Sequence, residues 1–175
     1  MKLRSFLKAG LACFVVFIIA FAAFFWRKSK LPPLGEAPFI EFPSTNAAQA
    51  EQFLDGNFSL ITNVRNLPSP VLVSFTEQGG SRFVIANPGE KFRATDVVYD
   101  ATLPSKRLIL AGVSGEKVFI HYEQGGIGLS HVLALFEIPL KDRIKPVWRG
   151  YCGGRAKSVE ELRSWLRDGT CRSSQ

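Results

Sequence analysis

The feature that most constrains the structure is an uncharged, apolar run of 18 residues near the N-terminus. The run covers residues 9–26. Basic residues flank it, with Lys2, Arg4 and Lys8 before it and Arg27, Lys28 and Lys30 after it. Because a helix that spans a bilayer needs roughly 17–25 predominantly apolar residues, the run predicts a transmembrane helix. Residues 1–8 then lie on one side of the membrane and the rest of the protein on the other.

The same run has a second interpretation, as a secretory signal peptide that is removed. The triplet Ala-Phe-Ala at 20–22 resembles a cleavage site of small residues, and cleavage there would start the mature protein near Ala23. Against this, the aromatic cluster Phe24–Trp26 is followed directly by Arg27, which is typical of an anchor at the membrane interface. We therefore expect a retained anchor, with signal cleavage as the alternative.

The cysteines predict the orientation of the protein in the membrane. The positive-inside rule does not, since three Lys or Arg residues lie on each side of the run. Beyond Cys13, the sequence has Cys152 and Cys171, which bracket a predicted helix. A pair of cysteines in an exported domain most simply forms a disulfide. We therefore expect residues 1–8 in the cytoplasm and the body of the protein in the periplasm or outside the cell, attached to the lipid bilayer through residues 9–26.

Residues 27–43 form a linker that contains four spaced prolines. Such spacing favours extended polyproline II, so the segment is predicted to act as a stalk that holds a domain away from the membrane. Phe39, Ile40 and Phe42 are larger and more apolar than a free stalk needs, so the alternative is a segment that lies along the domain. Each interpretation can hold for a different part of the linker.

Residues 44–140 predict an exported β-rich domain that begins with a short helix. Ser44 or Thr45 can cap this helix at its start, and Gly56 can end it. Seven apolar or β-branched runs follow, at 58–64, 70–76, 82–86, 96–99, 107–112, 117–123 and 129–138. Because turn-forming residues and no helices separate them, they predict an antiparallel β-sandwich or small barrel of about seven strands.

The tetrapeptide Glu-Gln-Gly-Gly occurs twice, at 77–80 and 123–126, each time after an alternating apolar run. Gly-Gly is a favoured hairpin turn, so a shared turn explains both copies without a duplication. In the first copy we expect a two-residue loop at 79–80, which places Glu77 opposite Arg82 as a favourable charge pair.

In the second copy, a loop centred on Gly126 places His121 directly opposite His131. Both faces of this strand pair are then largely apolar, as expected in the centre of a sheet. We expect the glycines at 125, 126 and 128 to supply positive φ angles in the loop. A slip of one residue would instead place the two histidines on opposite faces.

Two imidazoles with Glu123 nearby are a candidate metal site, since His and carboxylate groups bind Zn²⁺ or Cu²⁺. A closed zinc site needs four ligands and a catalytic one usually three, and no metal-binding signature surrounds His121 and His131. The more ordinary interpretation is that each histidine is hydrogen-bonded in or beside the sheet. We expect no cofactor.

Cys152 can be a nucleophile with a histidine as its base, or one half of a disulfide. Signatures of cysteine enzymes are absent, and the helix predicted at 158–169 has a capping box in Ser158 and Glu161. We favour a Cys152–Cys171 disulfide that fastens this helix. The apolar stripe of the helix is formed by Val159, Leu162, Trp165 and Leu166.

The C-terminal segment, 141–175, has nine basic and four acidic residues, a net charge of +5. With Trp148 beside Arg149, such a segment can bind an anionic surface, although a solvated charged surface is the more ordinary interpretation. We expect no nucleic-acid partner for an exported protein.

These features predict a single-pass membrane-anchored envelope protein with an exported β-sandwich domain that binds a protein partner. The sequence contains no glycine-rich phosphate loop, nucleophile elbow or haem-attachment motif, which favours a role other than catalysis. The alternative is a metal-binding protein or enzyme that uses the His121/His131 hairpin.

Overall fold

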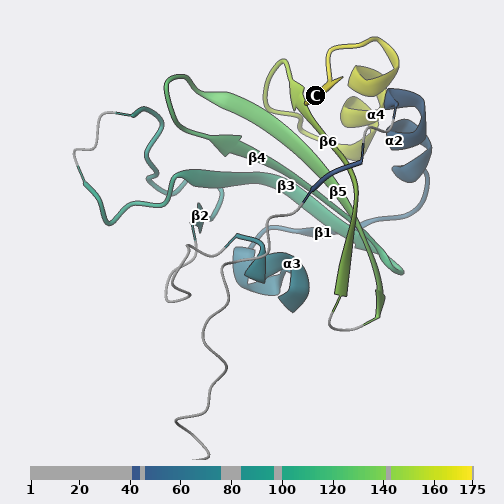
Figure 1. Cartoon of the computed structure of the whole chain (residues 1–175), viewed down its shortest axis with the longest axis horizontal. Coiled ribbons are helices and arrows are strands. Elements are labelled where there is room, and N and C mark those ends of the chain that lie inside the picture. The colour runs from purple at the N-terminus through teal and green to yellow at the C-terminus, as the bar shows by residue number, and fades with distance from the viewer. Residues whose placement is uncertain (1–40, 44–45, 76–83, 97–99, 141–142, 175) are drawn as a thin grey trace, which may run out of the picture. The chain divides into compact units, whose positions relative to one another are not determined.

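Four long strands, consecutive in the sequence, form the centre of the fold (Figure 1). They are β3 (Lys106–Ser114), β4 (Lys117–Gln124), β5 (Ser130–Leu140) and β6 (Arg143–Cys152). Each pairs antiparallel with the next, and β3, β4 and β5 confirm the strands predicted there. The computed structural model describes residues 41–43, 46–75, 84–96, 100–140 and 143–174.

Three short strands extend this centre into one sheet of seven strands. β1 (Ser59–Ile61) pairs antiparallel with β3, and β7 (Arg172–Ser173) pairs antiparallel with β6. β2 (Ile85–Ala86) pairs parallel with the start of β3. The order along the sheet is β1-β3-β4-β5-β6-β7. The prediction of a mainly antiparallel fold of about seven strands is confirmed. The β-sandwich or small barrel was wrong, since the described strands form a single sheet whose end strands β1 and β7 do not pair with each other.

Helices supply the layers that a second sheet would otherwise supply. α2 (Ala47–Phe53) and α4 (Val159–Arg167) contact each other and cover one face of the sheet, the α4 face. A 3₁₀ turn, η1 (Val64–Asn66), and α3 (Ser69–Val73) cover the other, the α3 face (Figure 1). Side chains alternate between these faces along each strand.

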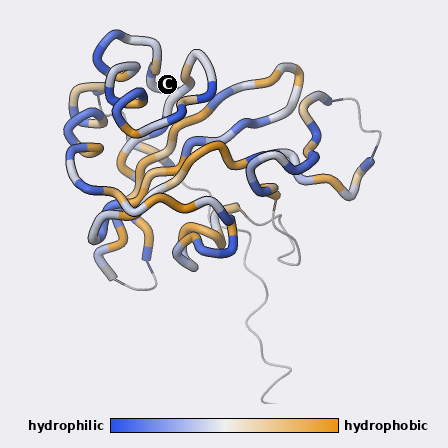
Figure 2. Tube along the Cα trace, turned by 180° about the vertical axis from the view of Figure 1, so that it is seen from behind, coloured by the Kyte–Doolittle hydropathy of each residue, from blue (hydrophilic) through white to orange (hydrophobic). Residues whose placement is uncertain are grey.

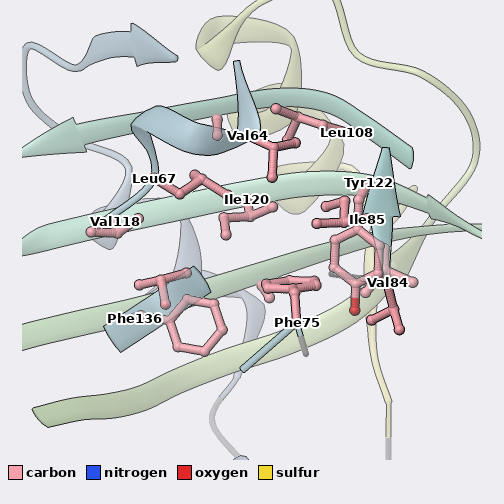
Figure 3. Close-up of a cluster of buried hydrophobic side chains, with 14 residues drawn as sticks. Val64, Leu67, Phe75, Val84, Ile85, Leu108, Val118, Ile120, Tyr122 and Phe136 are labelled. Carbon is pink, nitrogen blue, oxygen red and sulfur yellow. The ribbon is translucent and has the colours of Figure 1, made fainter. Parts of the chain in front are cut away.

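Each face carries its own apolar core, and apolar residues concentrate along the central strands (Figure 2). On the α3 face the buried residues are Val64, Leu67, Val71, Phe75, Val84, Ile85, Leu108, Ala111, Val118, Ile120, Tyr122, Val132, Ala134 and Phe136 (Figure 3). On the α4 face they are Ala50, Phe53, Leu54, Phe119, Leu133, Leu135, Trp148, Ala156, Val159, Leu162, Leu166 and Cys171.

The caps predicted for α4 are confirmed, whereas the N-cap predicted for α2 was wrong. α4 begins after Ser158, whose hydroxyl accepts a hydrogen bond from the Glu161 backbone N–H at 3.2 Å, and Gly169 follows its last turn with a φ of 79°. α2 begins after Asn46, whose side chain accepts from the Gln49 N–H at 2.9 Å. Because Asn46 is the N-cap, the cap predicted at Ser44 or Thr45 was wrong.

The strand predicted at 70–76 was wrong, because residues 69–73 form helix α3. Pro68 occupies the N-cap position and Pro70 the first turn. Proline favours the first turn of a helix, where its missing N–H is not needed and its φ is already suitable. The alternation of apolar residues before the first Glu-Gln-Gly-Gly therefore does not indicate a strand, whereas the residues before the second copy do form one, β4.

Strand β6 was not predicted, and it joins the basic segment 141–175 to the sheet. The sequence was interpreted here only as part of a basic segment, yet β6 pairs with β5 from Arg143 to Cys152. Pro146 lies beside a register irregularity in this pairing, where a missing N–H is tolerated. The compact unit Glu36–Gln175 contains the predicted β-rich domain and the basic segment together.

Several predictions fall on residues outside those described: the anchor at 9–26, most of the linker, the hairpin at 79–80, and positions 82–83 and 97–99 of two predicted strands. Within the described residues, none of the helices is long and apolar enough to cross a membrane. At the end of the linker, the Phe42 ring lies 5.5 Å from the Phe136 ring, centroid to centroid, so this part of the linker lies along the domain.

Candidate functional site

The β4–β5 hairpin that carries both histidines has a register two residues away from the predicted one. Its five-residue loop lies between the paired residues Gln124 and Ser130, so Glu123 is opposite His131, and His121 is opposite Leu133. The direct pairing of His121 with His131 was therefore wrong. Because the difference is an even number, both histidines and Glu123 still share the α4 face.

Space, and not positive φ, explains the glycine at the start of this loop. The described residues with positive φ do not include the loop glycines, which corrects that prediction. A Cβ atom on Gly125 would lie 1.8 Å from the carbonyl oxygen of Arg93, so no larger residue fits there. The segment around Arg93 packs against the hairpin, where Thr95 forms a bridge to Gly126.

His121 is fully buried in the sheet, and its ring nitrogens contact the backbone of two elements. Nδ1 lies 3.0 Å from the carbonyl oxygen of Val132, and Nε2 accepts a hydrogen bond from the Ala156 N–H at 3.1 Å. Nε2 also lies 3.1 Å from the Gly154 carbonyl. A neutral ring with its proton on Nδ1 satisfies both Val132 and Ala156.

Burial is the main reason why the pKa of His121 falls to about 4, although the carbonyls of Val132 and Gly154 oppose this change. The ring is therefore neutral at neutral pH. The prediction of a hydrogen-bonded histidine within the sheet is confirmed for this residue. A metal ion would have to displace these backbone contacts before it could bind the ring.

Glu123 is a buried carboxylate held by two arginines. Its side chain is 1% exposed, and Arg107 Nε donates to Oε2 at 2.7 Å. Arg155 donates to Oε1 through Nε at 2.8 Å and through Nη2 at 2.6 Å. Burial raises the pKa of Glu123, but the hydrogen bonds and charges of Arg107 and Arg155 outweigh it, so the pKa is lowered. Glu123 is thus a fixed anion.

His131 lies at the edge of this cluster and does not share a hydrogen bond with the carboxylate. Its Nε2 is 3.9 Å from Glu123 Oε1, and its side chain is partly exposed. Burial lowers the pKa of His131, the Glu123 charge opposes this change, and Arg155 adds to it. His131 is directly opposite Cys152 in the β5–β6 pairing.

The predicted Cys152–Cys171 disulfide is confirmed, with sulfur atoms 2.01 Å apart. It joins the end of β6 to the residue before β7 and closes the segment that contains α4. Because both sulfur atoms are bonded to each other, Cys152 has no thiol to act as a nucleophile, although a histidine lies beside it.

The loop 153–157 is held against the sheet by three features: His121, Glu123 and the disulfide. This loop contains two glycines and two basic residues, so it cannot be held by apolar burial alone. Among the described residues, no group of three or more His, Cys, Asp or Glu side chains is arranged to hold a metal ion. Two of the three candidate ligands, His121 and Glu123, contact this loop and tether it to the sheet.

Sequence reasoning missed Arg107 and Arg155, which complete the cluster. Arg107 is opposite Glu123 in the β3–β4 pairing, and a charge inside an otherwise apolar strand is the signal that could have suggested a buried partner. Arg155 lies 32 residues from Glu123 in a glycine-containing loop, where the sequence offers no comparable signal.

A cavity of about 170 Å³ opens beside this cluster. It is lined by Pro88, Gly89, Arg107, Leu108, Ile109, Glu123 and Arg155. No protein-family model, curated protein or solved structure matches the sequence.

Proposed function

We propose that the protein is a single-pass membrane-anchored protein whose exported domain binds a protein partner in the cell envelope. One observation supports the binding role: Ile127, at the tip of the β4–β5 hairpin, is 99% exposed. The disulfide supports the exported location, because such bonds persist in oxidising compartments and are rare in the cytosol. The apolar run at 9–26 supports the anchor.

An isolated exposed isoleucine is ordinary on a protein surface, so the setting of Ile127 matters. Leu129, two residues further on, is also largely exposed. The hairpin is braced at its base, since the Gly125 N–H donates to the Ser105 carbonyl at 2.9 Å and Gly126 pairs with Thr95. A loop that is already ordered loses less conformational entropy on binding, which favours a contact surface.

Tyr151 extends this surface at the same end of the sheet. It lies on β6 opposite Val132, close to the start of β5, and its side chain is substantially exposed. Tyrosine is enriched at protein interfaces because its ring buries a large area while its hydroxyl can bond to water or a partner. Ile127, Leu129 and Tyr151 form the proposed contact surface.

The location is tested with the full-length protein in the cell that makes it. A reporter that is active only outside the cytoplasm, fused after Gln175, should be active, and thiol labelling should find Cys152 and Cys171 protected until a reductant is added. A variant without residues 1–26, which stays in the cytoplasm, should label at both cysteines. A reporter that is active only in the cytoplasm would exclude the proposed orientation.

The binding role is tested by two substitutions of matched character. Ile127→Ser removes the apolar tip, and Leu60→Ser removes an exposed leucine from β1 at a distant edge of the sheet. In membranes solubilised with mild detergent, the protein should migrate in a complex larger than itself. Ile127→Ser should reduce that complex and Leu60→Ser should leave it unchanged. The opposite pattern would move the contact surface away from the hairpin.

A further inference from the structure

The cavity beside Glu123 presents two guanidinium groups that are only partly used by the protein. Each guanidinium has five N–H donors. Arg107 donates through Nε to Glu123 and through Nη1 to the carbonyl of Glu90 at 3.1 Å. Arg155 donates to Glu123 through Nε and Nη2. These contacts with described residues use two donor positions of each arginine and leave the others for a ligand.

Neighbouring groups hold both arginines in fixed positions. The Arg107 guanidinium lies 4.3 Å from the centre of the Phe92 ring, a cation–π distance. Arg155 is 56% exposed at its side chain, yet its paired contact with buried Glu123 fixes the plane of the guanidinium. The donors are therefore arranged before any ligand arrives, which lowers the entropy cost of binding.

Apolar groups form the remaining wall of the cavity. Pro88 and Gly89 are the central residues of a turn, with Gly89 at a φ of 79° as a type II turn requires, and the Glu90 carboxylate bonds back to Asn87. Ile109 lies in the irregularity of the β3–β4 pairing, between Leu108 and Leu110. A ligand in the cavity therefore meets charge on one side and apolar surface on the other.

The charges at the cavity favour a ligand with a single negative charge. Arg107 and Arg155 carry two positive charges and Glu123 carries one negative charge, so one further anion makes the site neutral. A carboxylate fits the fork of a guanidinium through two parallel hydrogen bonds. A phosphate dianion would leave an excess of negative charge beside buried Glu123.

We propose that this cavity binds a carboxylate carried on a small apolar group. Two sources share this chemistry: a free short-chain acid and the C-terminal carboxylate of a protein or peptide. The site lies on the α4 face and uses none of the residues of the hairpin tip, so it stands whether or not the tip binds a partner.

The test measures thermal unfolding of the full-length protein in detergent micelles at constant ionic strength. N-acetylalanine has a carboxylate on a small apolar group, and N-acetylalanine amide is its neutral counterpart. The acid should raise the melting temperature with a saturable dependence on concentration, because a ligand that binds only the folded state stabilises it. The amide should not. Equal effects of the acid and the amide would overturn the proposal.

Two variants locate the site, and a third controls for charge. Arg155→Gln should weaken the affinity for N-acetylalanine by about tenfold or more, as expected when a charged hydrogen bond is lost. Ile109→Phe should weaken it too, because it fills the cavity and leaves the arginines in place. Lys145→Gln removes an exposed lysine on β6 and should change nothing. Loss of affinity in Lys145→Gln to the same degree would indicate non-specific attraction and overturn the site.

Two further comparisons of affinity distinguish a free acid from a C-terminal carboxylate, and a carboxylate from a phosphate. Acetate that binds as tightly as N-acetylalanine supports the site and assigns it to free acids. Tighter binding of N-acetylalanine supports the site and assigns it to the C-termini of proteins or peptides. Inorganic phosphate that binds more tightly than either acid would overturn the assignment to carboxylates.

Discussion

The two faces of the sheet are covered by different means. On the α3 face, the 3₁₀ turn and α3 are held by an apolar core that includes Phe136 and the edge-to-face pair of Phe75 and Tyr122, whose ring centroids are 5.2 Å apart. On the α4 face, an apolar core is joined by two buried polar side chains, His121 and Glu123, and by the disulfide.

The difference follows from what each covering segment offers for burial. The segment from Val64 to Phe75 supplies several large apolar side chains, and burial alone contributes roughly 1.5–3 kcal/mol for each one. The loop 153–157 offers only Ala156 to the core, so directional contacts hold it. One face therefore depends on apolar area, whereas the other also depends on protonation state and on the redox state of two cysteines.

The largest expected effect concerns the α3 face. Phe136→Ala should lower the free energy of unfolding by about 3–5 kcal/mol, because the side chain is 2% exposed and its removal leaves a cavity. Ile127→Ala, at the exposed hairpin tip, should change it by less than about 0.5 kcal/mol. Chemical denaturation of both variants measures the difference. A cost for Phe136→Ala near that of Ile127→Ala would mean that the α3 face is not held by apolar burial.

Elements with a strong local signal in the sequence could be predicted, and elements without one could not. The three long strands that were predicted contain nearly continuous apolar runs bounded by turn residues, and both caps of α4, Ser158 and Gly169, directly flank its helical residues. Helix α3 was mistaken for a strand because five residues are too few for helical periodicity to appear, so only Pro68 and Pro70 distinguish it. Strand β6 was missed because charged residues and Pro146 interrupt its apolar pattern.

The candidate site was predicted only in part, because His121, Glu123 and His131 were named while Arg107, Arg155 and the geometry were missed. His121, Glu123 and His131 share a face, as expected from their spacing, yet the hairpin register depends on the close approach of Arg93 to Gly125. That contact joins segments 32 residues apart, and local turn preferences do not contain it. The partners of Glu123 are fixed by the same kind of long-range contact.

Acid should destabilise the α4 face through His121. The folded pKa of about 4 lies below the ordinary value of 6.5, so the unfolded state binds the proton more readily. The stabilisation is complete above about pH 6.5, is lost as the pH falls toward 4, and amounts to roughly 3–4 kcal/mol. Denaturant titrations between pH 7 and 4.5 should show this dependence.

The contribution of His121 is isolated by comparison with His121→Gln, which does not titrate in this range. The pH dependence of the variant should be clearly flatter, and the remaining slope includes His131 and Glu123, whose pKa values are also lowered. Identical slopes in the two proteins would show that protonation of His121 does not change the free energy of unfolding.

Removal of the disulfide should also act on the α4 face. The bridge spans 19 residues, and closure of such a loop contributes about 3 kcal/mol through the entropy of the unfolded state. The double variant Cys152→Ser/Cys171→Ser should lose about this much stability. Hydrogen exchange should increase in the amides of α4 more than in those of β3 and β4. Uniform loss of protection across both faces would show that the two faces unfold as one unit.

The smallest expected effect compares two glutamates. Glu123→Gln removes a buried charge and leaves Arg107 and Arg155 without their anion, at an expected cost of about 2 kcal/mol. This is less than for a fully buried pair, because Arg155 is largely exposed and regains water. Glu137→Gln breaks an exposed ion pair with Lys145 and should cost less than about 1 kcal/mol. Raised salt should reduce the second cost more than the first, since exposed charges are screened more strongly than buried ones. Equal costs with equal salt dependence would mean that Glu123 contributes no more to the α4 face than a surface charge does, and would leave His121 and the disulfide as its directional contacts.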